Sequence, residues 1–510
     1  MQSLIGVPVV LPLLAAGLKL AIGGRLRRLQ AMISIVTLAL VLVISGTLLI
    51  AADHLGPLVT SLGSWPAPVG ITLVADRLST LMLVVSSAVT LCVMVYSLSS
   101  AHLDQEHDAP MAIFHPAFLV MVAGVCDAFL SGDLFNLFVA FEMLLGGSYV
   151  LLTFGGTQPR IRAGATYTVM GLASSMLFLI ALAVAYAATG TLSMAQLAGR
   201  FAGLPGHIKL LVELTLLLVF AIKAAVFPLS AWLPDSYPTA PASATAVFAG
   251  LLTKVGVYSI IRLEALLFPG GPVAGLLMWL ALATMLVGVL GAVAQSDIKR
   301  MLSFTLVSHI GFMVFGVALS SEAGMAGAVF YVAHHITVQT SLFLVTGLIE
   351  RRTGTTSVDR LGGLARLTPV IAVLFFLPAM NLSGIPPMSG FLAKLLLVQA
   401  GVADGRPQAL VLVAGGLLTS LLTLYAVAKT WGKAFWRAPQ EAEEGDGSGD
   451  GEVATTTAMP VALIGSTAAL VALGLSYTLL AGPMSALATR TGAELLARTP
   501  YITAVLGEER

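Results

Sequence analysis

Several ionisable side chains lie inside long apolar stretches of the sequence, where a charge is costly. They are Glu142, Lys223, Lys254, His334, His335 and Lys394. On insertion scales, a charged group at the centre of a membrane helix costs about 2.5–3.5 kcal/mol. No argument from stability favours several such groups in one chain, so their presence indicates a function. Groups of these types bind and release protons, and a series of them could pass protons along.

The order of these groups predicts how they would act on one another. A charged Glu142 near Lys223 would hold the proton on that lysine, and weakening the pair would release it. Lys254 beside a charged Lys223 would favour its neutral form and accept a proton. Histidine titrates near neutral pH and can relay protons in both directions. The predicted path, at one depth of the membrane, runs through Lys223, Lys254, His334 or His335, and Lys394.

Each of these residues also has a structural explanation. Glu142 and Lys223 could form a buried ion pair that only supports the fold. The adjacent histidines could bind haem, with His309 as the histidine available on another helix. Neighbours on a helix point about 100° apart, so one of the two should face the path and the other should pack. For His309, functional and packing roles are equally supported. Lysines near helix ends commonly reach the membrane surface, which explains Lys19 and Lys429.

The composition identifies a lipid bilayer as the solvent for most of the chain. The 510 residues are 57% hydrophobic and 10% charged, whereas soluble proteins carry about 25% charged residues. A net charge of +1 gives no reason to expect a nucleic acid as partner. The cysteines, Cys92 and Cys126, lie in apolar runs, and the sequence has no Cys/His spacing typical of a metal site. It also lacks motifs for nucleotides, flavins or iron–sulfur clusters, so we expect no cofactor and no metal.

About fourteen stretches are long and apolar enough to span a bilayer. They lie at roughly 3–22, 30–51, 72–99, 112–130, 133–153, 162–188, 209–233, 240–263, 274–294, 299–319, 323–348, 367–400, 409–432 and 460–482. Lysine and arginine concentrate in the loops after spans 1, 5, 9, 11 and 13, which places both chain ends outside. The first stretch lacks the basic start and cleavage site of a signal peptide. We therefore expect an all-α, multi-pass protein of a bacterial inner (plasma) membrane.

Two of these stretches are interrupted in the same way. Span 7 runs into Pro228, and span 12 contains Pro386 and Pro387. Paired broken helices five spans apart are typical of an inverted repeat. The predicted domains are 1–110 (helices 1–3), 111–265 and 266–435 (two five-helix repeats, helices 4–8 and 9–13), 436–459 (an acidic, flexible cytoplasmic loop) and 460–510 (helix 14 and an amphipathic C-terminal segment, 484–498).

The motifs around these residues resemble a known family, the proton-translocating antiporter subunits shared by respiratory complex I and Mrp-type Na⁺/H⁺ antiporters. The resemblance rests on Ser131-Gly-Asp-Leu-Phe-Asn-Leu-Phe-Val-Ala-Phe-Glu142, Ala221-Ile-Lys-Ala-Ala-Val-Phe-Pro228, Leu252-Thr-Lys-Val-Gly256 and Gly384-Ile-Pro-Pro-Met-Ser-Gly-Phe-Leu-Ala-Lys394. It covers nearly the whole chain and implies fourteen helices with two inverted five-helix repeats. The implied roles are a coupling pair at Glu142 and Lys223, relays at Lys254 and His334 or His335, and a terminal proton site at Lys394.

Within this family, the run before Glu142 is similar to that of the D-type subunits of Mrp antiporters. The alternative is an N-type, proton-pumping subunit of complex I, the NADH–quinone oxidoreductase, which shares the lysine at position 394. A passive structural subunit is a third possibility, against which the buried lysines argue. The resemblance to D-type subunits implies secondary transport of H⁺ and Na⁺, or another monovalent cation. The implied partners are other small and large membrane subunits of the same complex and membrane lipids.

Overall fold

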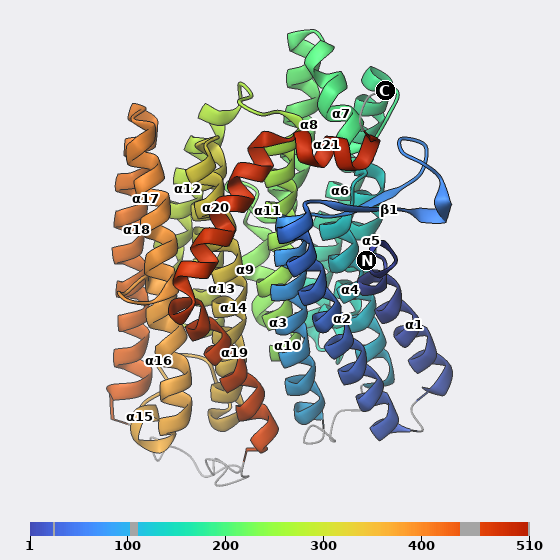
Figure 1. The fold of residues 1–510 in the computed structure, drawn as a ribbon. Coiled ribbons are helices and arrows are strands. Elements are labelled where there is room, and N and C mark those ends of the chain that lie inside the picture. The colour runs from blue at the N-terminus through green and yellow to red at the C-terminus, as the bar shows by residue number, and fades with distance from the viewer. Residues whose placement is uncertain (24–25, 102–110, 439–458, 508–510) are drawn as a thin grey trace.

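A computed structural model of the chain describes residues 1–23, 26–101, 111–438 and 459–507, and it shows a bundle of long helices (Figure 1). Among these described residues, twelve helices are long and apolar enough to cross a membrane. The other two predicted spans are the interrupted ones, each of which forms shorter pieces. The count of fourteen therefore stays a prediction. The predicted acidic loop falls mainly on 439–458, outside the described residues.

The N-terminal part contains a small sheet that the sequence did not reveal. Its helices are α1 (Val7–Ile22), α2 (Arg27–Leu55) and α3 (Arg77–Ala101). Between α2 and α3, the strands β1 (Leu58–Ser61) and β2 (Thr72–Ala75) pair in antiparallel fashion, with Leu58 opposite Ala75. Strands of four residues are too short for an alternating pattern to stand out beside long apolar helices.

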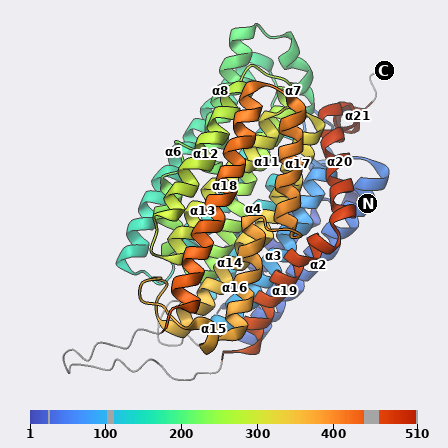
Figure 2. The same cartoon turned by 90° about the vertical axis from the view of Figure 1, so that its left-hand side faces the viewer.

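Two similar sets of helices follow. The first comprises α4 (Met111–Leu130), α5 (Leu134–Thr153), α6 (Gln158–Thr189), α7 (Met194–Arg200), α8 (Gly206–Ala224), α9 (Trp232–Ser236), α10 (Ala242–Val247) and α11 (Thr253–Arg262). The second comprises α12 (Ala274–Val293), α13 (Ile298–Ala318), α14 (Glu322–Thr353), α15 (Leu364–Leu367), α16 (Pro369–Ser383), α17 (Ser389–Asp404) and α18 (Pro407–Trp431). Figure 2 shows α16, α17 and α18 gathered on one side of the bundle. The chain closes with α19 (Val461–Leu479), α20 (Ala481–Ala497) and α21 (Thr499–Leu506).

The two sets reproduce each other at the level of single contacts. Asp133 begins α5 and Asp297 begins α13, and each carboxylate accepts hydrogen bonds from backbone N–H groups of the first turn. Each aspartate also forms an isolated β-bridge with a serine that follows the next long helix, Asp133 with Ser193 and Asp297 with Ser357. These aspartates are therefore helix caps.

The two predicted breaks also correspond. Ala225 directly follows α8 and Gly384 directly follows α16, and both residues have a left-handed backbone, with φ of 59° and 84°. Proline follows soon after each of them, at Pro228 and Pro386, and cannot donate a backbone hydrogen bond. With the five spans predicted for each repeat, an odd number, the second repeat starts from the opposite side. The two inverted repeats with broken helices are confirmed.

Ion pairs join the N-terminal part to the rest. Asp76 and Arg262 of α11 approach to 2.6 Å, and both side chains are buried. Burial raises the pKa of Asp76, but the Arg262 guanidinium and hydrogen bonds from Ser79 outweigh it and hold the pKa below its usual range. A charged Asp76 therefore serves the fold.

The C-terminal segment 484–498 forms most of α20, which runs along α14 (Figure 1). Its inward face buries Ala488, Thr491, Gly492 and Leu495. Polar residues of the same helix pair with the N-terminal part: Arg490 with an aspartate of α2 and Glu494 with an arginine of α3. α20 therefore fastens the second repeat to the N-terminal helices.

Two lysines near helix ends behave differently. The prediction that Lys19 reaches the membrane surface was wrong, because its side chain is fully buried and donates to the Ser34 hydroxyl of α2. Ser34 supplies the polar partner that makes this burial tolerable. Lys429 of α18 donates to the carbonyl of Val293, the last residue of α12, at 2.8 Å. Lys429 is thus a fixed cation at a helix C-terminus.

Candidate functional site

Glu142 of α5 and Lys223 of α8 approach each other through Ser175 of α6. The Ser175 hydroxyl donates to the Glu142 carboxylate and accepts a hydrogen bond from Lys223 Nζ at 3.1 Å. Lys223 Nζ also lies 5.1 Å from the centre of the Phe141 ring. Among the described residues, no direct ion pair joins Glu142 to Lys223. The two charged groups are therefore coupled through one hydroxyl, and Ser175 is the residue that sequence reasoning missed.

Lys254 finds its partner within its own segment. The side chain is fully buried, and Nζ donates to the backbone carbonyl of Ala249 at 2.6 Å. Ala249 belongs to a π-helical turn, Phe248–Leu252, that precedes α11. Such turns shift the regular bonding pattern and are frequent at functional sites. The turn gives the buried ammonium an acceptor without any carboxylate.

Close packing brings the helices of Lys223 and Lys254 together. A Cβ at Gly256 of α11 would stand 2.5 Å from the backbone nitrogen of Ala224 in α8, so only glycine permits this approach. No hydrogen bond between the described side chains links the two lysines directly. The helices of the two lysines are therefore joined by close packing, and not by a hydrogen bond between the lysines.

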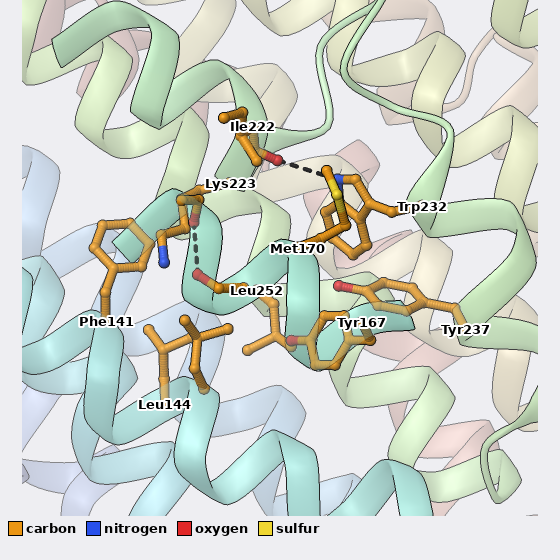
Figure 3. Close-up of a pocket in the computed structure, with 12 residues that line it drawn as sticks. Phe141, Leu144, Tyr167, Met170, Ile222, Lys223, Trp232, Tyr237 and Leu252 are labelled. Atoms are coloured by element: carbon orange, nitrogen blue, oxygen red, sulfur yellow. Dashed lines mark hydrogen bonds between the residues drawn. The ribbon is translucent and has the colours of Figure 1, made fainter. Parts of the chain in front are cut away.

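A cavity of about 30 Å³ lies beside Lys223. Figure 3 shows Lys223 and Phe141 at one side of it and the aromatic residues Tyr167, Trp232 and Tyr237 at the other. A water molecule needs at least about 10–15 Å³ of such space. The cavity can therefore hold water within reach of the lysine.

Three histidines gather between α13, α14 and α17. The rings of His309 and His335 lie 5.1 Å apart, centre to centre, and His309 Nδ1 is 2.7 Å from the Tyr331 hydroxyl. His334 turns the other way, with Nδ1 3.0 Å from the Ser389 hydroxyl at the start of α17. All three histidine side chains are at most 1% exposed. The two adjacent histidines thus face different neighbours, and His309 joins the cluster of His335.

Lys394 lies just beyond the second break. Its Nζ donates to the carbonyls of Leu382 and Ser383, at 3.2 and 3.0 Å, which are the last two of α16. A helix C-terminus leaves carbonyls free and carries partial negative charge. The break in span 12 therefore builds a cation site in which one half of the span binds the lysine of the other.

The fold brings together the second half of the predicted series, which runs from Lys254 through the histidines to Lys394. His335 interacts electrostatically with Lys254 and with Lys394, and so does His309. These groups come from four different helices, α11, α13, α14 and α17. Glu142 and Lys223 form a separate group, joined through Ser175.

The histidine cluster and the cavity occupy matching places in the two repeats. Tyr167 and Tyr331 are each the tenth residue of their helices, α6 and α14. The thirteenth and fourteenth residues of α6 are Met170 and Gly171, which line the cavity. In α14 the same positions hold His334 and His335. Leu145 of the cavity and His309 of the cluster likewise share the twelfth position of α5 and α13.

Comparison with known proteins identifies the family to which the chain belongs. A model described as the transmembrane part of the NADH:quinone oxidoreductase/Mrp antiporter family matches residues 131–423. The chain belongs to this family. The match covers both broken spans and the helices that carry the histidines, so the resemblance drawn from the motifs is confirmed.

Individual members of the NADH:quinone oxidoreductase/Mrp antiporter family are similar over most of their length. The D-type Na⁺/H⁺ antiporter subunit of Alkalihalophilus pseudofirmus is 39% identical over 447 residues, which cover 87% of this chain and 89% of the relative. A chain of the Mrp complex from Dietzia sp. is 32% identical and superposes with a TM-score of 0.90, covering 99% of both chains. A chain of respiratory complex I from Thermus thermophilus is 25% identical, with a TM-score of 0.78 over 96% of this chain and 99% of that chain. The multi-pass antiporter-subunit fold is thereby established.

Proposed function

We propose that this chain is the proton-translocating subunit of a multi-subunit antiporter that exchanges Na⁺, or another monovalent cation, for H⁺. The observation that carries the proposal is the buried series of titratable groups. Its buried members are Lys223, Lys254, His309, His334, His335 and Lys394, and the half-buried Glu142 stands at its start. As a subunit of a secondary transporter, the chain is not an enzyme. The bacterial relatives support a bacterial inner membrane, and the loop charges favour an orientation with both chain ends outside.

Ser175 supports the control of Lys223 by Glu142. A serine hydroxyl has one hydrogen to donate, and here it goes to the Glu142 carboxylate. Its remaining lone pairs accept from Lys223 Nζ. An ionised Glu142 thus favours a protonated Lys223 through a polarised hydroxyl, because the bonds of such a chain strengthen one another. Protonation of Glu142 removes that polarisation and lets the lysine release its proton.

Free ring nitrogens support a relay through the histidines. His335 has no hydrogen-bond partner at either nitrogen, and His309 and His334 have none at Nε2, among the residues that the structure describes. A relay needs such nitrogens, since each must accept a proton on one side and release it on the other. The free nitrogens lie between Lys254 and Lys394, the two lysines that the relay would connect.

The relatives favour cation/proton antiport over redox-driven pumping. The chain superposes more closely on the Mrp complex chain than on the complex I chain, with TM-scores of 0.90 and 0.78. A complex I subunit of the N type is the alternative. Co-purification decides between them: small membrane subunits are expected with this chain, whereas peripheral redox subunits would contradict the proposal.

We expect the purified chain alone to be inactive in liposomes. The proposed partners are the other small and large membrane subunits of the complex, and both solved structures named above are of multi-subunit complexes. The measurement is Na⁺-driven H⁺ movement, followed with a pH-sensitive dye, for the chain and for the whole complex. Full exchange by the chain alone would refute the need for partners.

We expect Glu142→Gln to lower exchange about tenfold or more, nearly as much as Glu142→Ala. Glutamine keeps the volume and a hydrogen bond to Ser175 but lacks the charge that favours a protonated Lys223. Exchange in membrane vesicles is the measurement, with Glu322→Gln, at an exposed glutamate, as the matched control. Substantial activity of Glu142→Gln would show that the residue serves only packing or hydrogen bonding.

A further inference from the structure

Two glutamates outside the proposed proton path lie buried at one end of the first repeat. Glu213 of α8 is fully buried, and Glu264, in the π-helical turn Leu263–Leu267 after α11, is 3% exposed. Glu213 stands ten residues before Lys223, and Glu264 stands ten residues after Lys254. Because α8 and α11 pack against each other and ten helical residues span about 15 Å, the glutamates share one level and the lysines another. This level lies toward the end that carries α7 and α21 (Figure 1).

The carboxylate oxygens of this glutamate pair are left without partners. Both oxygens of Glu213 and Oε1 of Glu264 accept no hydrogen bond from any described residue. Buried carboxylates are normally paired or bound to a cation, because an isolated buried charge is very costly. The two groups also act on each other electrostatically. The pair therefore needs a small positive ligand.

The loop after Glu264 is shaped around Glu213. A Cβ at Gly271 would collide with Oε1 of Glu213 and would stand 3.1 Å from the carbonyl oxygen of Phe268. A carboxylate oxygen and a backbone carbonyl oxygen thus converge beside Gly271, where a larger residue would force the Glu213 side chain to shift. The Phe268 ring is held by stacking on Phe201, with the centroids 4.6 Å apart. This stacking anchors the residue that supplies the carbonyl oxygen.

The charged groups around Glu213 and Glu264 supply one positive charge too few to neutralise both carboxylates. Lys209 of α8 acts on Glu213 without forming an ion pair with it among the described residues. Arg200 of α7 and Arg498 before α21 each donate to a backbone carbonyl, and Arg262 is neutralised by its ion pair with Asp76. Arg490 and Glu494 of α20 form ion pairs with the N-terminal helices. Two carboxylates and one lysine carry a net charge of −1, which a single monovalent cation or one proton neutralises. Carboxylate and carbonyl oxygens suit hard cations of the Na⁺ type.

We propose that Glu213 and Glu264 form a monovalent-cation site at which one Na⁺ and one proton compete. Binding of the cation releases the proton that the pair otherwise holds, so charge is conserved at the site. The choice of Na⁺ rests on the proposed antiport. The existence of the site rests on the buried unpartnered oxygens and the glycine-shaped loop, and it is tested without transport.

The test is ²²Na⁺ binding to the purified full-length chain between pH 6 and pH 9. We expect one Na⁺ site. Its affinity for Na⁺ should fall about tenfold for each unit by which the pH is lowered, in the range where the proton competes. Glu213→Gln and Glu264→Gln should each weaken binding at least about tenfold, because a charged ligand is lost. Gly271→Ala should weaken it as well, although it removes no charge. Glu322→Gln is the control of matched chemistry and should bind as wild type does.

Three results would overturn the proposal. The first is equal Na⁺ binding by wild type and by both glutamine variants. The second is binding that does not change with pH, since then no proton competes. The third is no Na⁺ binding by the wild type at any pH, which would leave the pair with a proton only. Failure of the proposed antiport is separable, because Lys223→Ala should stop exchange and leave Na⁺ binding intact.

Discussion

We expect Lys223→Ala to reduce Na⁺/H⁺ exchange to background, at least about a hundredfold below wild type, while the complex stays assembled. Loss of a positioned proton donor and acceptor commonly costs two to four orders of magnitude in rate. Lys223 is the basic residue that meets both Ser175 and the cavity, so no neighbour replaces it. The lost charge is one that was costly to bury, so the fold should tolerate its removal. The measurement is Na⁺-dependent H⁺ movement in everted vesicles, with assembly followed by native electrophoresis.

Two further variants make this result interpretable. Lys223→Met keeps the volume of the side chain and should fail as Lys223→Ala does. Lys433→Ala removes a lysine that pairs with Asp359 in an exposed position and should leave exchange unchanged. Near-normal exchange in Lys223→Ala would show that the coupling pair is wrongly assigned. Loss of assembly in both Lys223 variants would instead assign Lys223 to the fold.

The second large effect is expected at Lys394, where Lys394→Arg should lower exchange about tenfold or more although it keeps the charge. Arginine stays protonated at any accessible pH, so it can satisfy the carbonyls of Leu382 and Ser383 but cannot pass a proton on. Lys394→Ala should also stop exchange. Lys394→Glu should retain a part of it, since a protonated carboxyl can donate to the same carbonyls and still release its proton. The measurement is exchange in vesicles across external pH for all three variants.

Lys429 supplies a matched control for the arginine substitution. It also donates to a carbonyl at a helix C-terminus, that of Val293, but lies outside the proposed path. Lys429→Arg should therefore exchange at nearly the wild-type rate. If Lys394→Arg did so too, Lys394 would supply a fixed positive charge and would not itself carry a proton.

The charged residues of the path could be found from sequence because burial of a charge is so unfavourable that chance rarely places one in mid-helix. The same reasoning found the two breaks, since proline has a direct effect on the backbone. Ser175 escaped because a serine in a long apolar helix is ordinary, and its two partners come from other helices. The acceptors of Lys254 and Lys394 escaped because they are backbone carbonyls, which every residue carries.

Other features depended on three-dimensional neighbours that the sequence does not encode locally. His309 had no clear role until its ring was found against that of His335. Lys19 was misread because Ser34 lies on a different helix. Glu213 and Glu264 drew no attention from sequence, because each lies near a predicted span end, where a carboxylate usually meets water. In each case the spacing along the chain carried no signal of the contact.

The matching positions of the cavity and the histidine cluster mean that one duplicated scaffold would give the proposed proton path two kinds of conductor. In the first repeat the space beside Tyr167 is a cavity that can hold water, whereas in the second the matching positions beside Tyr331 carry imidazoles. A solvent-filled conductor can be blocked by drying, while a conductor of fixed bases is insensitive to hydration and depends on ring rotation instead. The two halves of the molecule should therefore differ in their response to osmotic stress and to deuterated solvent.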